Sequence, residues 1–97
     1  MTIRHRFHLD QNGHSISVLY EGPRRPVEVL VDGKTVVMGR APRAARTVLT
    51  AELPGDPPQP FSIDLACPAD SADGPMCALM EAGTRYPMPD VPLRPGR

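Results

Sequence analysis

The stretch VEVLVDGKTVVM, residues 27–38, alternates apolar and polar side chains up to an Asp-Gly step and continues as an apolar run. Val27, Val29 and Val31 share one face of an extended strand, because successive side chains of a strand point to opposite faces. The step Asp32-Gly33 is typical of a two-residue hairpin, since a type I′ turn requires positive φ at both central residues. The stretch therefore predicts a β-hairpin with one buried face.

The segments before this hairpin show the same alternation. Residues 3–9 and 16–20 carry mostly apolar side chains at every second position, and the polar residues 10–13 between them are typical of a turn. With the loop 21–26 they predict a four-stranded meander over residues 2–38, whose apolar faces coincide as a common register requires. The expected cross-strand pairs are Ile3–Tyr20, His5–Val18, Phe7–Ile16, Ile16–Val31, Val18–Val29, Tyr20–Val27, Val29–Val36 and Val27–Met38.

A second set of strands follows a predicted linker, residues 39–46. The proline-rich loop 54–60 and the turn 68–74 separate further alternating segments. Residues 76–88 predict a strand, an Ala-Gly turn and a short edge strand, whereas the good helix formers in 76–83 favour a helical turn as the alternative. The expected pairs are Leu49–Leu65, Ala51–Ile63, Leu53–Phe61, Leu65–Leu79 and Cys67–Cys77.

The two halves, 2–38 and 47–88, have the same order of parts, which indicates an internal pseudo-repeat. We expect one all-β domain over residues 1–88, an antiparallel β-sandwich of about seven to eight strands built from two hairpin-rich halves. A small closed β-barrel is the alternative. The proline-rich tail, residues 89–97, is expected to be extended, either against the domain or free of it.

Composition limits the class of protein. The 97 residues allow one domain, thirteen prolines and eight glycines argue against long helices, and the abundance of Ala, Arg and Pro is typical of GC-rich bacterial genomes. The sequence contains neither a membrane-spanning apolar run nor the apolar core of a signal peptide, so a cytoplasmic location is expected. Cys67 and Cys77, predicted neighbours across two strands, are then either packed thiols or a disulfide.

Charge is unevenly distributed although the formal net charge is zero. Residues 1–46 contain eight Lys and Arg against four Asp and Glu, and residues 47–97 contain three against seven. Such a division can attract a charged partner or a second copy, or the halves can complement each other within one domain. Arg4, Arg6 and His8 form an outward basic stripe, but no outward aromatic side chains lie between them, which argues against nucleic-acid binding.

The candidate catalytic residues form no recognised motif. His5 and His8 point to opposite faces of their strand, whereas His5 and His14 share a face and could form a metal site with a carboxylate, or serve as a core histidine and a surface histidine. No serine lies in a nucleophile elbow, and no glycine-rich phosphate loop is present. Paired carboxylates on one apolar face are also missing, because Glu52 and Asp64 are expected to face outward on their strands. The sequence thus predicts neither a cofactor nor a catalytic residue.

The repeated hairpin with VEVLVDGKTV resembles the all-β, two-sheet module of the Fas apoptotic inhibitory molecule family, in which strands ending in a Val-Asp/Asn-Gly-Lys turn recur. The resemblance covers mainly residues 14–37 and more faintly residues 61–86. It implies a non-enzymatic protein that acts through contacts, and it transfers no functional residue.

The leading hypothesis is a non-enzymatic β domain that binds another protein or its own copy. The alternative is a small-ligand or anion binder, or an accessory subunit of an enzyme that uses His5 and His14. The residues expected at an interface are Arg4, Arg6, Leu19 and Leu30. Those expected around a small ligand are His5, His14, Tyr20, Arg24 and Arg25.

Overall fold

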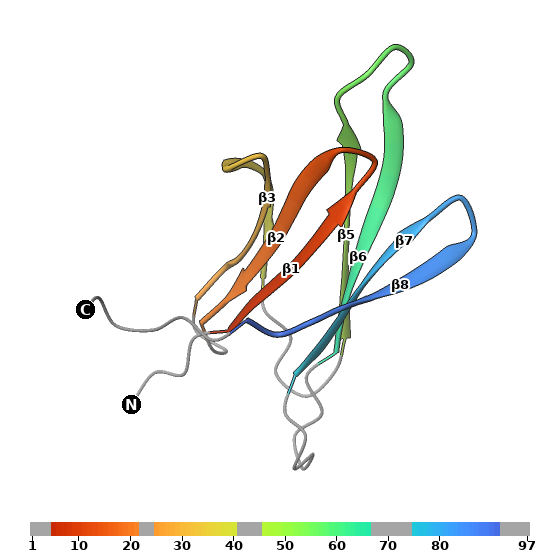
Figure 1. Cartoon of the computed structure of the whole chain (residues 1–97). Coiled ribbons are helices and arrows are strands. Elements are labelled where there is room, and N and C mark those ends of the chain that lie inside the picture. The colour runs from red at the N-terminus through yellow and green to blue at the C-terminus, as the bar shows by residue number, and fades with distance from the viewer. Residues whose placement is uncertain (1–4, 22–24, 41–45, 67–74, 92–97) are drawn as a thin grey trace.

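The computed structural model describes residues 5–21, 25–40, 46–66 and 75–91, and it confirms an all-β architecture. Two four-stranded antiparallel sheets each follow the order of the sequence (Figure 1), and neither closes into a barrel, so the barrel alternative is wrong. The first sheet contains β1 (His5–Gln11), β2 (His14–Tyr20), β3 (Val27–Val31) and β4 (Lys34–Gly39). The second contains β5 (Arg46–Leu53), β6 (Gln59–Ala66), β7 (Met76–Glu81) and β8 (Thr84–Met88).

Three hairpins close through two-residue turns that require positive φ. The turn residues are Asn12-Gly13, Asp32-Gly33 and Ala82-Gly83, and φ lies between 51° and 86° at all six positions. This is the type I′ requirement expected at Asp32-Gly33, and glycine meets it without a steric penalty. The same conformation at Ala82-Gly83 confirms the strand–turn–strand prediction for residues 76–88, and the helical alternative is wrong.

The predicted register of the first hairpin is wrong by two residues. Phe7 pairs with Val18, and not with Ile16, because the turn comprises only Asn12-Gly13 while residues 10 and 11 continue β1. A shift of two residues keeps every side chain on its predicted face. The predicted pairing of Val18 with Val29 on the other side of β2 is confirmed.

A β-bulge changes the pairing between β3 and β4. Val29 pairs with Val37, and not with Val36 as expected, while Leu30 pairs with Thr35. Val36 is therefore the extra residue on β4, and its side chain is exposed. Beyond the bulge Val27 pairs with Gly39, which belongs to a strand and not to the predicted linker.

The second sheet is also shifted by two residues from the predicted register. Phe61 pairs with Ala51, and not with Leu53, because β5 and β6 extend further into the proline-rich segment than expected. Leu65 lies opposite Cys77, so the predicted alignment of Cys77 with Cys67 is wrong. Cys67 itself lies outside the described residues. Leu49–Leu65, Ala51–Ile63 and Leu65–Leu79 are likewise replaced, by Leu49–Ile63, Ala51–Phe61 and Ile63–Leu79.

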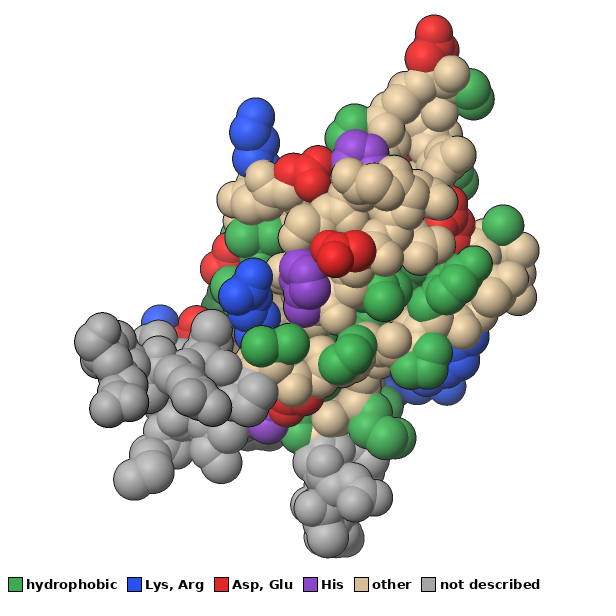
Figure 2. Space-filling view, viewed as in Figure 1, with side chains coloured by type: hydrophobic (Ala, Val, Ile, Leu, Met, Phe, Trp, Pro, Cys, Tyr) green, Lys and Arg blue, Asp and Glu red, His purple; other side chains and the backbone are tan. Residues whose placement is uncertain are grey.

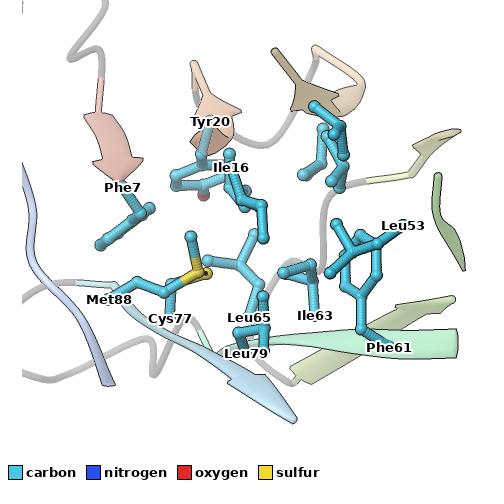
Figure 3. Close-up of a cluster of buried hydrophobic side chains, with 14 residues drawn as sticks. Phe7, Ile16, Tyr20, Leu53, Phe61, Ile63, Leu65, Cys77, Leu79 and Met88 are labelled. Atoms are coloured by element: carbon cyan, nitrogen blue, oxygen red, sulfur yellow. Dashed lines mark hydrogen bonds between the residues drawn. The ribbon is translucent and has the colours of Figure 1, made fainter. Parts of the chain in front are cut away.

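Apolar side chains from both sheets meet in one core between the two layers. Figure 3 shows Phe7, Ile16 and Tyr20 of the first sheet facing Leu65 and Leu79 of the second. Cys77 contacts the Met88 sulfur at 3.7 Å within this core. The remaining buried apolar members are Val18, Val27, Val29, Val31, Leu53, Phe61 and Ile63.

The chain returns to the first sheet after β8. Phe7 forms a β-bridge with Asp90, and the Val91 N–H donates a hydrogen bond of 2.6 Å to the Arg6 carbonyl. Residues 89–91 thus lie beside residues 6–8 at the outer edge of β1 (Figure 1), whereas residues 92–97 of the predicted tail lie outside the described residues. None of the residues that the structure describes belongs to a helix able to span a membrane.

Candidate functional site

The predicted small-ligand residues do not form one site. His5 stacks on Phe7 and Tyr20, with ring centroids 6.1 Å apart in both cases, and its Nδ1 lies 2.6 Å from Asp90 Oδ2. His14 lies at the opposite end of the hairpin, beside the Asn12-Gly13 turn. Among the members of the expected site that the structure describes, only His5 and Tyr20 therefore come together.

The structure supports neither the predicted arginine contacts nor the predicted metal site among the residues that it describes. Arg25 is exposed, and Arg24 lies outside the described residues. Across residues 5–21, 25–40, 46–66 and 75–91, no three His, Cys, Asp or Glu side chains come close enough to hold a metal ion. Each of the two histidines instead contacts its own carboxylate, His5 that of Asp90 and His14 that of Asp32.

The carboxylate beside His14 belongs to the turn residue Asp32. Asp32 Oδ2 lies 2.7 Å from His14 Nδ1, and Asp32 Oδ1 accepts a hydrogen bond of 2.9 Å from the Ser15 N–H. The Ser15 hydrogen bond, and next the His14 contact, lower the pKa of Asp32 below its ordinary value. The charged carboxylate thus ties the tip of the β3–β4 hairpin to β2.

We expect Asp32→Asn to lower stability at neutral pH but not in acid. Asparagine tolerates the left-handed backbone of this turn, so the substitution mainly removes the charge. A carboxyl whose pKa is lowered by folding stabilises the protein above its unfolded pKa, about 3.9, and loses this contribution as the pH falls through the folded pKa. Urea denaturation should show a stability difference at pH 7 that shrinks below about pH 4. A difference independent of pH would contradict this role.

The side chains of Asp10, His8 and Ser17 lie in a row on the outer face of the first sheet, with the imidazole between the carboxylate and the hydroxyl. His8 Nε2 lies 3.2 Å from Asp10 Oδ1, and His8 Nδ1 lies 3.0 Å from Ser17 Oγ. On the face shown in Figure 2, histidine side chains lie next to acidic ones. Similar sets activate serine in hydrolases, but these also need N–H donors aimed at the substrate oxygen. Because β2 pairs with β1 and β3 around Ser17, the amides of β2 serve the ladders and are not available as such donors.

The predicted interface residues are largely brought together. Arg6, Leu19 and Leu30 lie on the outer face of the first sheet, as expected, and they line the same shallow depression; Arg4 lies outside the described residues. The depression has a volume of about 420 Å³. Its other lining residues are Ser15, Ser17, Glu21 and Gly33.

The outer face of the second sheet holds a buried carboxylate that sequence reasoning missed. Asp64 faces outward, as expected, but only 3% of its side chain is exposed. Its Oδ2 accepts a hydrogen bond of 2.8 Å from Arg85, and its Oδ1 lies 3.0 Å from Arg46 Nε, without the alignment of a hydrogen bond. Arg85 extends from β8 across β7 to Asp64 on β6. Ala78 of β7, opposite Asp64, has a small side chain that leaves room for the arginine, and Ala78 is itself buried.

Exposed apolar side chains surround this ion-pair cluster of Arg46, Asp64 and Arg85. Met76 and Met80 of β7 are 54% and 37% exposed, and they lie on the same face as Ala78 between them. Val48 of β5, directly opposite Asp64, is also exposed. We call this surface the methionine face: Val48, Met76, Ala78 and Met80 around the ion-pair cluster.

Comparisons with protein-family models, with curated proteins and with solved structures found no significant match to this chain. The resemblance to the Fas apoptotic inhibitory molecule family therefore stays a prediction.

Proposed function

We propose that this chain is a non-enzymatic protein-binding domain that holds its partner on the methionine face. The observation that supports the proposal is the exposure of Met76 and Met80 beside the ion-pair cluster. Exposed apolar side chains that lie close together favour a contact with another macromolecule, because covering them removes apolar surface from water. The proposal includes the cytoplasmic location that the sequence predicts.

The chemistry of the methionine face favours a protein partner. Methionine side chains are flexible and polarisable, so they adapt to the shape of an opposing surface. Methionine and arginine are also enriched in protein interfaces, where charged residues are otherwise scarce. Asp64 already orients Arg46 and Arg85, which reduces the entropy lost when a partner orders these side chains.

Charge indicates what the partner contributes. Two guanidinium groups share one carboxylate, so the ion-pair cluster carries one net positive charge. Arg46 and Arg85 are 63% and 53% exposed, and both can contact a second carboxylate. The proposed partner therefore presents apolar side chains with an acidic residue among them.

The double substitution Met76→Glu/Met80→Glu tests this proposal. We expect the immobilised wild-type chain to enrich a specific protein from a lysate of the encoding organism, and the double variant to retain at least about tenfold less, because buried anchors dominate binding energy. The matched control is Val36→Glu/Met38→Glu, which changes two exposed apolar residues of β4 on the first sheet. Equal retention by the Met76→Glu/Met80→Glu variant would contradict the proposal.

A further inference from the structure

Each sheet ends in two edge strands, and three of the four described edges are protected against pairing with another chain. The Val91 N–H bonds to the Arg6 carbonyl and the His8 N–H bonds to the Pro89 carbonyl, so the segment after β8 covers the edge of β1 at residues 6–8. β8 contains Pro87, which has no N–H, and β4 carries the bulge at Val36. Prolines, bulges and covering segments all prevent a sheet from adding a strand.

β5 lacks these protections. It runs for eight residues, contains neither proline nor glycine, and pairs with β6 without a register shift. Among the strands that the structure describes, β5 pairs with β6 alone. The Glu52 side chain makes no hydrogen bond or ion pair with any described residue, and Leu49 is only half-buried although it packs against the core. The edge thus has an unused charge and an incompletely covered apolar side chain.

The side chains of β5 match those of a second, antiparallel copy. A two-fold axis at Leu49 places Arg46 of one copy opposite Glu52 of the other, and Val48 opposite Thr50. Each of these pairs occurs twice, because the axis exchanges the copies. Opposite charges directly across an antiparallel pair attract, and like charges repel. Moving the axis to Val48 or Thr50 removes both ion pairs, so the charges favour the register centred on Leu49.

We infer that two copies of this chain form a symmetric dimer through antiparallel pairing of their β5 strands. The pairing joins the two second sheets, satisfies the open edge of β5 and covers Leu49. A guanidinium has five N–H donors, so the contact of Arg46 with Asp64 leaves donors for Glu52 of the second copy. The inference goes beyond the proposed function, because the dimer forms at the β5 edge. It shares Arg46 and Val48 with the methionine face and leaves Met76, Met80 and Arg85 of each copy for the partner.

Sedimentation velocity of the full chain over a concentration series tests the dimer. The wild type should show a reversible monomer–dimer equilibrium. Glu52→Arg sets like charges opposite each other at both symmetric positions, so the dissociation constant should rise at least about tenfold. Asp10→Arg changes the net charge equally, at an exposed residue of the first sheet, and should leave the dissociation constant within about twofold.

A charge exchange between the copies makes the test specific. An Arg46→Glu chain mixed with a Glu52→Arg chain regains both opposite-charge pairs, and the mixed dimer should form more tightly than either variant dimer. If Arg46→Glu does not fold beside Asp64, salt replaces it as the test, since screening should weaken the wild-type dimer. A wild type that stays monomeric at its highest soluble concentration overturns the inference. So does a dimer that Glu52→Arg leaves unchanged, or one that Met76→Glu/Met80→Glu abolishes.

Discussion

Replacement of Leu79 by alanine is expected to lower the free energy of unfolding by about 2–5 kcal/mol. Leu79 is fully buried on β7, where its cross-strand neighbours are Ile63 of β6 and Tyr86 of β8. The shortened side chain loses its transfer from water and leaves a cavity that two flanking strands keep open. Urea denaturation monitored by circular dichroism measures this loss.

The matched control is Met80→Ala, one residue further along the same strand. Met80 points to the outer face and is partly exposed, so its truncation should change stability by only about 0.5 kcal/mol. The contrast between neighbouring positions tests which face of β7 is buried. A larger loss at Met80 than at Leu79 would mean that β7 presents the opposite face to the core.

Asp64→Ala is expected to lower the free energy of unfolding by about 1.5–3 kcal/mol, the range for hydrogen bonds to charged groups. Asp64 is buried, but Arg46 and Arg85 are more than half exposed, and water can solvate them once the carboxylate is gone. Solvent screening therefore keeps the loss below that of a fully buried ion pair.

A double-mutant cycle assigns this loss to the Arg85–Asp64 contact. If the hydrogen bond of 2.8 Å stabilises the fold, Arg85→Ala should cost little once Asp64 is absent. Glu52→Ala serves as the control in dilute solution, because Glu52 lies exposed on the same face without a described partner. Additive effects of Asp64→Ala and Arg85→Ala would show that the contact contributes nothing.

The faces of the strands could be predicted from the sequence because alternation is a local signal. Val27, Val29 and Val31 are all buried, as their spacing indicates, and so are Ile16 and Val18. These assignments survive register errors of two residues, since such a shift preserves the face of every side chain.

Register was harder to predict because it depends on the length of each turn. The polar composition of residues 10–13 suggested a four-residue turn, whereas the structure uses Asn12-Gly13 alone. Asn-Gly is as typical of a type I′ turn as Asp32-Gly33, so applying the same rule twice would have given the correct register. Nothing in the apolar run that contains Val36 indicates which residue forms the bulge.

The candidate sites show the same division between local and long-range signals. His8 and Asp10 are two residues apart on one predicted strand, so their contact could have been found from the sequence. Arg46 and Arg85 reach Asp64 from strands on both sides, and Arg85 crosses β7 to do so. Such a contact depends on an exact register over three strands, and the predicted register was shifted there.

The protection of the β1 edge has a consequence for the newly made chain. β1 leaves the ribosome before the other strands that the structure describes, but the residue whose N–H covers its edge, Val91, is about 80 positions further along. At translation rates of 5–20 residues per second, the delay is roughly 4–16 s. During this interval the nascent first sheet can hydrogen-bond to neighbouring nascent chains through β1. Until residues 89–91 are synthesised, the uncovered β1 edge thus favours aggregation between chains on crowded polysomes.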